Sequence, residues 1–285
     1  MTADRLPYTW MGPAFGGPAS RVVSLVPSLT HALFELGAGE SVVGRTEYCV
    51  LPAGEVDGIP TLGGTKNPDV DAILGLAPDL VLANREENTR RRVERIAERA
   101  PVLLTDPRSP GEVPALWRVL GEVTGRGDAG EHLARGVEVE LERAVAKAPP
   151  APVFVYWIWR DPWMAAGHGT YISELLEASG WRNGLPPDRT RYPKVEPAEV
   201  NALGVQVMLF SSEPFDFALP RDLDAWPGSP VEDDGLWRLD DGLVAVPVDG
   251  RLLSWFPSLT AAGLRHAREL RGRLLTHWIR GARDD

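Results

Sequence analysis

Several features that would assign this chain of 285 residues to a common class are missing from it. Its only cysteine is Cys49, so an intramolecular disulfide is excluded. No apolar run approaches the roughly 18 residues of a membrane-spanning helix, and we expect no membrane insertion. The formal net charge is −10 and no basic tract is present, which argues against nucleic acid as a partner.

Motifs of the common enzymes are also missing. There is no G-x-S-x-G elbow and no P-loop, and the glycine-rich stretch at 37–44 closes a helical pattern instead of opening one. The histidines are scattered without metal-ligand spacing; His168, in a Gly-His-Gly turn, is the one candidate axial ligand, and its role stays open. We therefore expect no catalytic residues, no resident metal, no cofactor and no enzymatic activity.

Short apolar segments alternate with amphipathic ones along most of the chain, which is typical of parallel βαβ units. Strands are predicted at 21–26, 42–44, 79–83, 101–105, 153–159, 205–210 and 243–248. Helices are predicted at 31–37, 69–76, 87–99, 112–123, 170–179, 196–203 and 258–279, with Ser28 or Thr30 capping the first. Segment 214–241 has little periodicity and is predicted to be rich in loops.

A long amphipathic helix is predicted at 128–147, between two similar patterns. Asp128 and Glu131 have capping-box spacing, and one apolar stripe consists of Leu133, Val137, Leu141 and Val145. Such a helix either packs within one domain or connects two, and the renewed βα pattern after it favours a connector. The predicted organisation is a flexible arm at 1–20, an N-terminal α/β lobe at 21–127, the connecting helix at 128–147 and a C-terminal α/β lobe at 148–285.

In open parallel sheets, ligands bind beyond the carboxyl ends of the strands. The loops predicted there carry large aromatic residues, which suit a flat, partly apolar ligand, although any single ring could instead fill core space. The same loops carry arginines that either form a solvated rim or hold phosphate, carboxylate or amide groups of a ligand. These arginines are Arg45, Arg85, Arg160, Arg189 and Arg251.

Four stretches together resemble the helical-backbone substrate-binding proteins of ABC importers, and most of all their vitamin B12-binding branch. They are RVVSLVPSLTHALFELG, LGGTKNPDVDAILGLAPDLVLANREEN, VFVYWIW and FPSLTAAGLRHARELRGRL. The resemblance implies two Rossmann-like α/β lobes joined by a single long backbone helix, with a ligand cleft between the lobes. It implies a small metal chelate as ligand, namely a corrinoid such as vitamin B12, a ferric siderophore or heme. It also implies an ABC permease as partner and a monomeric state.

Individual residues can be carried over from this resemblance. Tyr48, Trp163 and Tyr192 stand where B12-binding members place aromatic cleft residues, whereas Thr65 and Asn84 stand where the enteric member has tryptophans. The expected ligand-binding residues are Ser28, Tyr48, Thr65, Lys66, Asn84, Arg85, Trp159, Trp163, Tyr192 and Trp255. Members dock on the permease through one carboxylate per lobe. Asp71 occupies the first position as a shortened glutamate. Ala198 occupies the second, where the neighbouring Glu196 or Glu199 could substitute, and Glu199 is the expected docking residue.

The resemblance implies a periplasmic or cell-surface location. Residues 1–20, however, lack the apolar block of a signal peptide, which leaves a cytoplasmic binding protein without a transporter as the alternative. Two other classes remain as rivals: a chelatase-type enzyme, which requires a histidine or carboxylate cluster, and a plain interaction module without a pocket.

Overall fold

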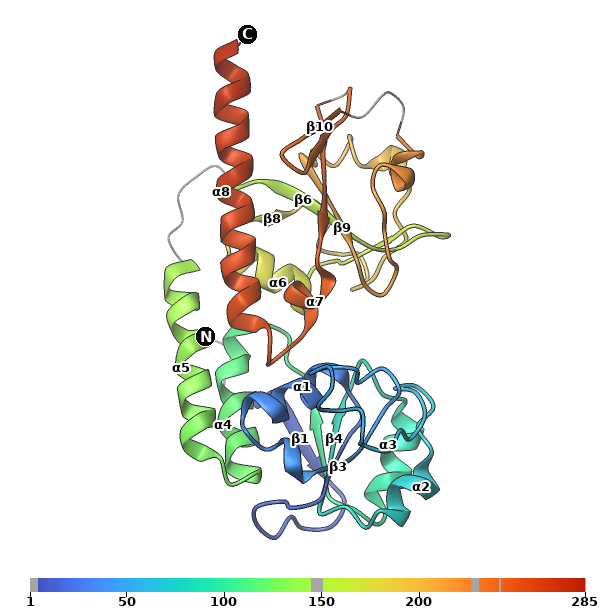
Figure 1. The fold of residues 1–285 in the computed structure, drawn as a ribbon. Coiled ribbons are helices and arrows are strands. Elements are labelled where there is room, and N and C mark those ends of the chain that lie inside the picture. Colours follow the sequence, from blue (N-terminus) through green and yellow to red (C-terminus); the bar gives the residue numbers. More distant parts are fainter. Residues whose placement is uncertain (1–4, 145–150, 227–230, 241, 285) are drawn as a thin grey trace. The chain divides into compact units, whose positions relative to one another are not determined.

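The structure is a computed structural model that describes residues 5–144, 151–226, 231–240 and 242–284. Its helices and strands group into two compact α/β units, each with its own sheet (Figure 1). The first unit contains the chain up to Pro107, Gly111–Glu138 and Phe256–Ser258. The second contains Arg108–Pro110, Val139–Trp255 and the chain from Leu259 onward. The predicted fold class of two α/β lobes is confirmed.

The first sheet has the strand order β1-β5-β4-β2-β3. Its strands are β1 (Tyr8–Met11), β2 (Val22–Ser24), β3 (Val42–Arg45), β4 (Leu80–Asn84) and β5 (Val102–Thr105). β2 to β5 pair in parallel, as the alternating pattern predicted, whereas β1 adds to the edge antiparallel to β5. The prediction of a flexible arm is therefore wrong at β1, because its β-prone residues Tyr8, Thr9 and Trp10 pair with β5.

Helices lie on both sides of the first sheet (Figure 1). They are α1 (Pro27–Glu35), α2 (Val70–Gly75), α3 (Arg90–Ala97) and α4 (Val113–Val123), with short 3-10 helices η1 (Gly39–Ser41) and η2 (Pro110–Glu112). Apolar residues of α2 and α3 share one buried cluster with alternate residues of the strands, as the period of two in a strand requires. This packing fixes the level at which the strands end.

The cap predicted for α1 is wrong. The helix begins at Pro27 with Val26 as its N-cap, because proline has its φ preset for the first helical turn. Ser28 and Thr30 therefore lie inside the helix and are buried. The Thr30 hydroxyl donates to Ser24 Oγ at 2.8 Å and to the Val26 carbonyl at 3.1 Å, so it ties the helix start to the end of β2.

The long helix α5 spans Gly127–Ala144, and the division between the two units falls within it, after Glu138. It begins one residue earlier than predicted, so Asp128 lies in its first turn, and the Glu131 carboxylate accepts from Arg118 and Arg135 instead of closing a capping box. The last predicted residues, 145–147, lie outside the described residues. Gly130 lets α5 approach α4 closely, because a Cβ there would stand 2.6 Å from the Trp117 carbonyl oxygen.

The second sheet has the order β10-β11-β12-β9-β6-β7, with β8 also pairing with β6. Its strands are β6 (Val153–Trp159), β7 (Met164–Ala165), β8 (Arg182–Asn183), β9 (Val207–Ser211), β10 (Val231–Asp233), β11 (Leu236–Arg238) and β12 (Val244–Val248). β6, β9 and β12 are parallel neighbours, as predicted. Segment 214–241, predicted to be rich in loops, contains the antiparallel hairpin β10–β11, which the sequence pattern did not predict.

Three helices pack together in the second unit: α6 (Tyr171–Ala178), α7 (Gly250–Ser254) and α8 (Thr260–Asp284). The helix predicted at 196–203 is wrong. Only the 3-10 helix η3 (Pro197–Glu199) forms there, and Asn201, which follows it, has a low helix propensity. A further 3-10 helix, η4, spans Arg221–Leu223. Glu140 of α5 is buried and accepts from Arg265 and Arg268 of α8. Within the described residues, no helix is both long and apolar enough to cross a membrane.

Candidate ligand-binding site

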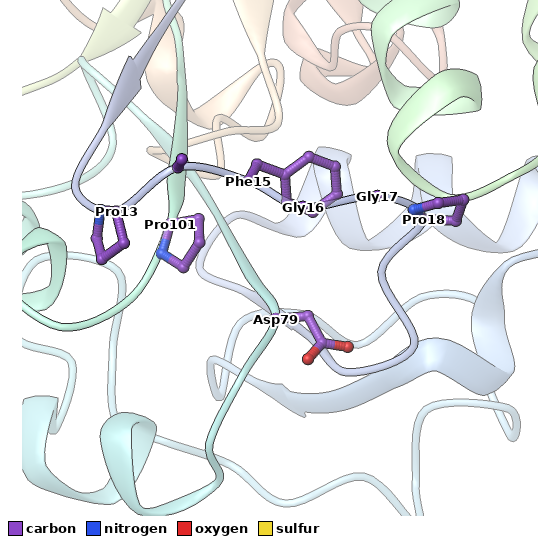
Figure 2. A pocket seen from close by; sticks show the side chains of 8 residues that line it. Pro13, Phe15, Gly16, Gly17, Pro18, Asp79 and Pro101 are labelled. Atoms are coloured by element: carbon purple, nitrogen blue, oxygen red, sulfur yellow. The ribbon is translucent and has the colours of Figure 1, made fainter.

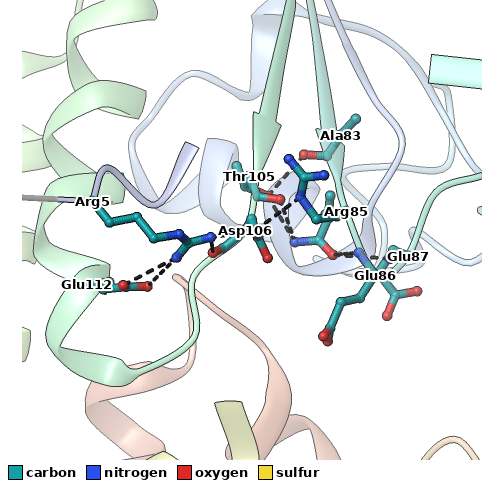
Figure 3. A network of polar contacts seen from close by, with 9 residues as sticks. Arg5, Ala83, Arg85, Glu86, Glu87, Thr105, Asp106 and Glu112 are labelled. Carbon is teal, nitrogen blue, oxygen red and sulfur yellow. Dashed lines mark hydrogen bonds and ion pairs between the residues drawn. The ribbon is translucent and has the colours of Figure 1, made fainter. Parts of the chain in front are cut away.

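A buried polar network lies at the carboxyl ends of β4 and β5 in the first unit (Figure 3). The Asn84 side-chain amide donates to both the carbonyl and the hydroxyl oxygen of Thr105, each at 3.1 Å. Its oxygen accepts from the backbone amides of Glu86 and Glu87 at 2.9 and 3.1 Å. Because Asn84 is 1% exposed and its polar atoms are used within the chain, the structure gives it a structural role instead of the predicted ligand contact.

Asn88 extends this network to two further loops. Its oxygen accepts from the Asn84 backbone amide at 2.8 Å, and its nitrogen donates to the carbonyl oxygens of Leu25 and Thr65 at 3.2 and 2.9 Å. Thr65, predicted to bind ligand, is buried, as is Ser28. The loops that follow β2 and β4, together with the loop that contains Thr65, are therefore held together by one asparagine that the sequence analysis did not single out.

The carboxyl ends of the strands, with the loops that follow them, are called the first edge in the first unit and the second edge in the second unit. Asp106, directly after β5, is the carboxylate around which the charged side chains of the first edge gather. Arg5 and Arg85 approach it from either side (Figure 3), with Arg85 Nε 3.1 Å from Asp106 Oδ2. Arg5 also lies 3.4 Å from Glu112. The Arg85 side chain is 55% exposed, whereas the Asp106 side chain is 10% exposed. The buried carboxylate therefore orients the arginine, and the guanidinium remains accessible at the surface.

Tyr48 is the exposed aromatic ring of the first edge, at 58% exposure. It lies over Gly64, where a Cβ would stand 3.2 Å from the ring and 2.6 Å from Asn67 Oδ1. Lys66 is exposed nearby and its ammonium donates to the Glu86 carbonyl oxygen. Arg45, in contrast, is buried and donates to backbone carbonyls, so it serves the loop's own structure.

The second unit carries the larger aromatic surface, at the end of β6. Trp159 is 42% exposed and meets Phe215 edge-on at a centroid distance of 5.7 Å. Trp163, predicted as a cleft ring, is partly buried: it is stacked on Phe217 at 5.7 Å and edge-on to the fully buried Trp157 at 5.1 Å. The position of Trp163 in a polar loop did not reveal this packing, because its partners come from distant loops.

Arg160 follows Trp159 and is held by two carboxylates. Its terminal nitrogens lie 2.6 Å from Asp222 and 2.6 Å from Asp224, and its guanidinium lies 5.4 Å from the centre of the Trp163 ring. Burial opposes ionisation of Asp222, but hydrogen bonds from Arg221, the Ala218 amide and Arg160 outweigh it and lower the pKa of this carboxyl.

The remaining predicted residues of this edge are partly fixed by the chain. The Trp255 indole N–H donates to Glu213 Oε2 at 3.1 Å, which orients a half-buried ring. Tyr192 is 36% exposed, with the Arg191 guanidinium 5.9 Å from its ring centre. Arg251 lies 3.2 Å from Asp249, the N-cap of α7.

His168 is engaged within its own unit. Its Nε2 lies 2.8 Å from the Leu185 carbonyl oxygen, and its Nδ1 lies 3.3 Å from Glu177 Oε1. These partners leave neither ring nitrogen directed to a metal. Among the described residues, no group of three or more histidine, cysteine, aspartate or glutamate side chains is arranged to hold a metal ion.

Both predicted docking carboxylates are at the surface. Asp71, in the first turn of α2, is 79% exposed in its side chain and lies 2.8 Å from Arg95. Glu199, in η3, is 40% exposed and lies 2.7 Å from Arg189. Each carboxylate is thus presented by a short helix and paired with one arginine of its own unit.

An open pocket of about 540 Å³ lies on the first unit, lined by residues 13–18, Asp79 and Pro101 (Figure 2). Asp79 and Pro101 directly precede β4 and β5, so the pocket is at the amino ends of these strands. Asp79 Oδ2 accepts from the Ser20 amide and hydroxyl, both at 2.9 Å, and these bonds lower its pKa. No residue predicted to bind ligand lines this pocket.

Comparison with known proteins gives relatives that are binding proteins. The chain is 24% identical over 200 residues to the vitamin B12-binding protein of Pectobacterium carotovorum subsp. carotovorum (strain PC1), covering 68% of this chain and 72% of the relative. It is 26% identical over 200 residues to the vitamin B12-binding protein of Yersinia pestis (strain Pestoides F), covering 68% and 70%.

Solved structures have the same fold. The periplasmic vitamin B12-binding protein of Vibrio cholerae superposes with a TM-score of 0.72 at 17% identity, over 88% of this chain and 96% of that one. The periplasmic heme-binding protein of Roseiflexus sp. RS-1 superposes with a TM-score of 0.70 at 24% identity, over 90% and 97%. The family model described as periplasmic binding protein matches residues 22–226. The chain therefore belongs to the periplasmic binding protein family, and it is a substrate-binding protein of the helical-backbone class, not an enzyme.

Proposed function

We propose that this protein is the substrate-binding component of an ABC importer and that it binds a corrinoid, similar to vitamin B12, or another metal chelate. The observation that carries the proposal is the set of exposed rings at the carboxyl ends of the strands: Tyr48 in the first unit, and Trp159 with Tyr192 in the second. Aromatic residues combined with a few polar groups are typical of the lining of small-molecule binding sites.

The chemistry of these edges suits a macrocycle with a flat apolar face and a polar rim. An aromatic ring gains contact area and little entropy cost when it stacks on such a face. Polar groups of the ligand would meet Lys66 and the exposed side of Arg85 in the first unit. The vitamin B12-binding relatives named above support a corrinoid as the first candidate.

Heme is the second candidate, because a heme-binding protein is among the structures with the same fold. His168 is engaged by Leu185 and Glu177, so an axial bond from this residue to heme iron is not part of the proposal. A ferric siderophore is the third candidate ligand that the family resemblance implies, and it is included in the titration described below.

Import requires docking on a permease, and we assign this role to Asp71 and Glu199. Their exposure allows each carboxylate to exchange its internal arginine for an arginine of a permease at small cost, since exposed ion pairs contribute only about 0–1 kcal/mol. The corresponding location is the periplasm or the cell surface. A binding protein that acts without a transporter would predict no effect of these carboxylates on uptake.

Titration of the purified protein with cyanocobalamin, dicyanocobinamide, hemin and a ferric siderophore tests the proposal. Calorimetry and quenching of tryptophan fluorescence are expected to show saturable binding of one corrinoid per chain. Hemin binding without corrinoid binding would support the second candidate. Incorporation of metal into a free tetrapyrrole would favour a chelatase, and no heat or quenching with any chelate would refute the proposed function.

A matched pair of variants links binding to the exposed rings. Tyr48→Ala is expected to weaken binding about tenfold, since stacking of one ring contributes on the order of 1 kcal/mol. Trp10→Ala is the control, because Trp10 is also exposed, at 41%, but lies on β1 opposite Leu103, toward the amino end of β5, and stacks on Phe15. Equal losses in the two variants would show that the edge rings are not the binding surface.

A further inference from the structure

The cationic side chains at the first ligand edge are neutralised by the chain itself. Arg85 is paired with Asp106, and Arg5, which shares this carboxylate, is also paired with Glu112. Lys66 donates to the carbonyl oxygen of Glu86. The arginines at this edge are therefore matched by carboxylates before any ligand arrives.

The arginines of the second edge are likewise paired with carboxylates of the chain, and Asp222 is shared between Arg160 and Arg221. Arg160 has two carboxylates at 2.6 Å, Asp222 and Asp224, and a third, Asp161, at 4.0 Å. Arg251 is paired with Asp249 and Arg189 with Glu199. Asp222 is 1% exposed, so this carboxylate is buried within the second unit and is not a solvent-exposed side chain.

A polyanionic ligand would have to compete with these carboxylates. It would displace short, charge-assisted bonds, and it would leave Asp106 or the buried Asp222 with one partner fewer in a region of low dielectric constant. A neutral chelate avoids this cost, because amide groups accept from arginine Nη atoms that remain paired with their carboxylates. The whole chain, with its net charge of −10, adds a field that also repels anions.

We propose that Asp106 and Asp222 set the charge selectivity of the strand ends on which they lie: Asp106 holds Arg85 and Asp222 holds Arg160, so each carboxylate favours a metal chelate without net negative charge at its own edge. This inference rests on the proposed function, since it names the charge class of the ligand that the same edges bind. It favours a neutral or cationic corrinoid over a ferric tris-catecholate, which is strongly anionic, and over hemin with its two propionates.

Calorimetric titration of the wild-type protein at low and high ionic strength tests the proposal. Dicyanocobinamide, a neutral corrinoid, is expected to bind at least tenfold more tightly than a ferric tris-catecholate, with little dependence on salt, because a neutral ligand has no charge for salt to screen. Tighter binding of the ferric tris-catecholate, weakening steeply with salt, would overturn the selectivity while the proposed function stands. Failure of all chelates to bind would refute both.

Two variants test the carboxylates directly. Asp106→Asn is expected to strengthen binding of hemin roughly tenfold, because the Arg5 and Arg85 guanidiniums then have charge to offer a propionate. Asp222→Asn is the corresponding change in the second unit. Asp224→Asn, whose side chain is 58% exposed, is the second variant if Asp222→Asn does not fold. Dicyanocobinamide affinity is expected to change much less in both variants.

The matched controls are Glu94→Gln and Asp234→Asn. Each removes one carboxylate from an exposed ion pair, with Arg90 and Arg273 respectively. An equal gain of hemin affinity in these controls would reduce the effect to net charge and overturn the assignment to Asp106 and Asp222. Unchanged hemin affinity in both edge variants, with circular dichroism of the folded protein, would overturn it as well.

Discussion

The two sheets have similar parallel centres, but the edges at which their strands end differ in chemistry. In the first unit the strand ends are joined by buried amides, with Asn84 and Asn88 bonded to several loops and one exposed ring, Tyr48. In the second unit the strand ends carry an aromatic cluster, with Trp157 buried and Trp159 exposed. The same topology therefore supports a polar edge in one unit and an aromatic edge in the other.

This difference separates residues that hold the edge from residues that face outward. Trp157 and Trp159 are two positions apart, which would place them on the same face of a regular strand, but the pairing of β6 with β7 shifts register between them. Trp157 is buried, whereas Trp159, the last residue of β6, is exposed. In the first unit, Asn84 holds the loop while Arg85, one position later, is at the surface. In each unit we therefore expect the buried residue to contribute to folding stability and its exposed neighbour to contribute to ligand binding. Substitutions at these positions test this expectation.

The largest expected effect is on the aromatic core of the second unit. Trp157→Ala should lower the free energy of unfolding by about 3–5 kcal/mol, because a fully buried ring is replaced by a cavity. Urea unfolding followed by circular dichroism measures the change, and Trp159→Ala should stay within about 1 kcal/mol of wild type. Equal destabilisation by the two variants would contradict the assignment of Trp157 to the core and of Trp159 to the surface.

The polar edge predicts a smaller loss. Asn84→Ala should destabilise the protein by about 2–3 kcal/mol, since the Thr105 oxygens and the amides of Glu86 and Glu87 lose their partner. Asn67→Ala, at an exposed asparagine of a nearby loop, is the control and should change stability little. If both variants unfold at the same urea concentration, the network does not organise this edge.

The aromatic edge predicts a change in affinity. Trp159→Ala should weaken corrinoid binding by about 1–2 kcal/mol, measured by calorimetry, because its exposed ring loses contact area with the ligand. Phe215, which packs edge-on against Trp159, should contribute less when replaced by alanine. Wild-type affinity in Trp159→Ala would remove the second unit's exposed tryptophan from the site.

The smallest expected effect is a change in the pH dependence of stability, and it concerns the glutamates of α5. Glu131 pairs with Arg118 at the surface of the first unit, whereas Glu140 is buried against Arg265 and Arg268. Burial raises the pKa of Glu140, but hydrogen bonds from Arg268 and Arg265 outweigh it, and the net shift is downward. A lowered folded-state pKa stabilises the protein above the unfolded-state pKa of about 4.3, and this stabilisation is lost as pH falls through the folded value.

Glu140→Gln should therefore flatten the fall of stability at acid pH, by on the order of 1 kcal/mol relative to wild type. Thermal unfolding across pH 3 to about pH 7 measures it, with exposed Glu142→Gln as the control. Parallel pH profiles for wild type and Glu140→Gln would show that the buried ion pair does not contribute.

The strands were predictable because each is a short apolar run bounded by turn residues, and β2, β4, β6 and β9 formed close to where these runs lie. Details that depend on tertiary partners were not. The hairpin β10–β11 is polar and exposed on β10, and the helix predicted at 196–203 contains Asn201, so local pattern misled in both places.

The candidate site was predictable in its edges but not in its roles. Tyr48 and Trp159 were placed correctly at strand ends, because the carboxyl-end rule needs only the strand boundaries. Trp163 packs with Phe217, and Asn84 bonds with Thr105, through contacts that no local pattern contains. Asp106 follows β5 directly, so the same rule, applied to that strand, would have found it.

The central claim is that the exposed rings at the strand ends, Tyr48 and Trp159 among them, bind a metal chelate. Its most direct test is calorimetric titration of dicyanocobinamide into wild type and into the double variant Tyr48→Ala/Trp159→Ala. The account predicts saturable binding to wild type with one ligand per chain, and loss of roughly 100-fold in affinity in the double variant with unchanged thermal stability. Wild-type affinity in a folded double variant would contradict it.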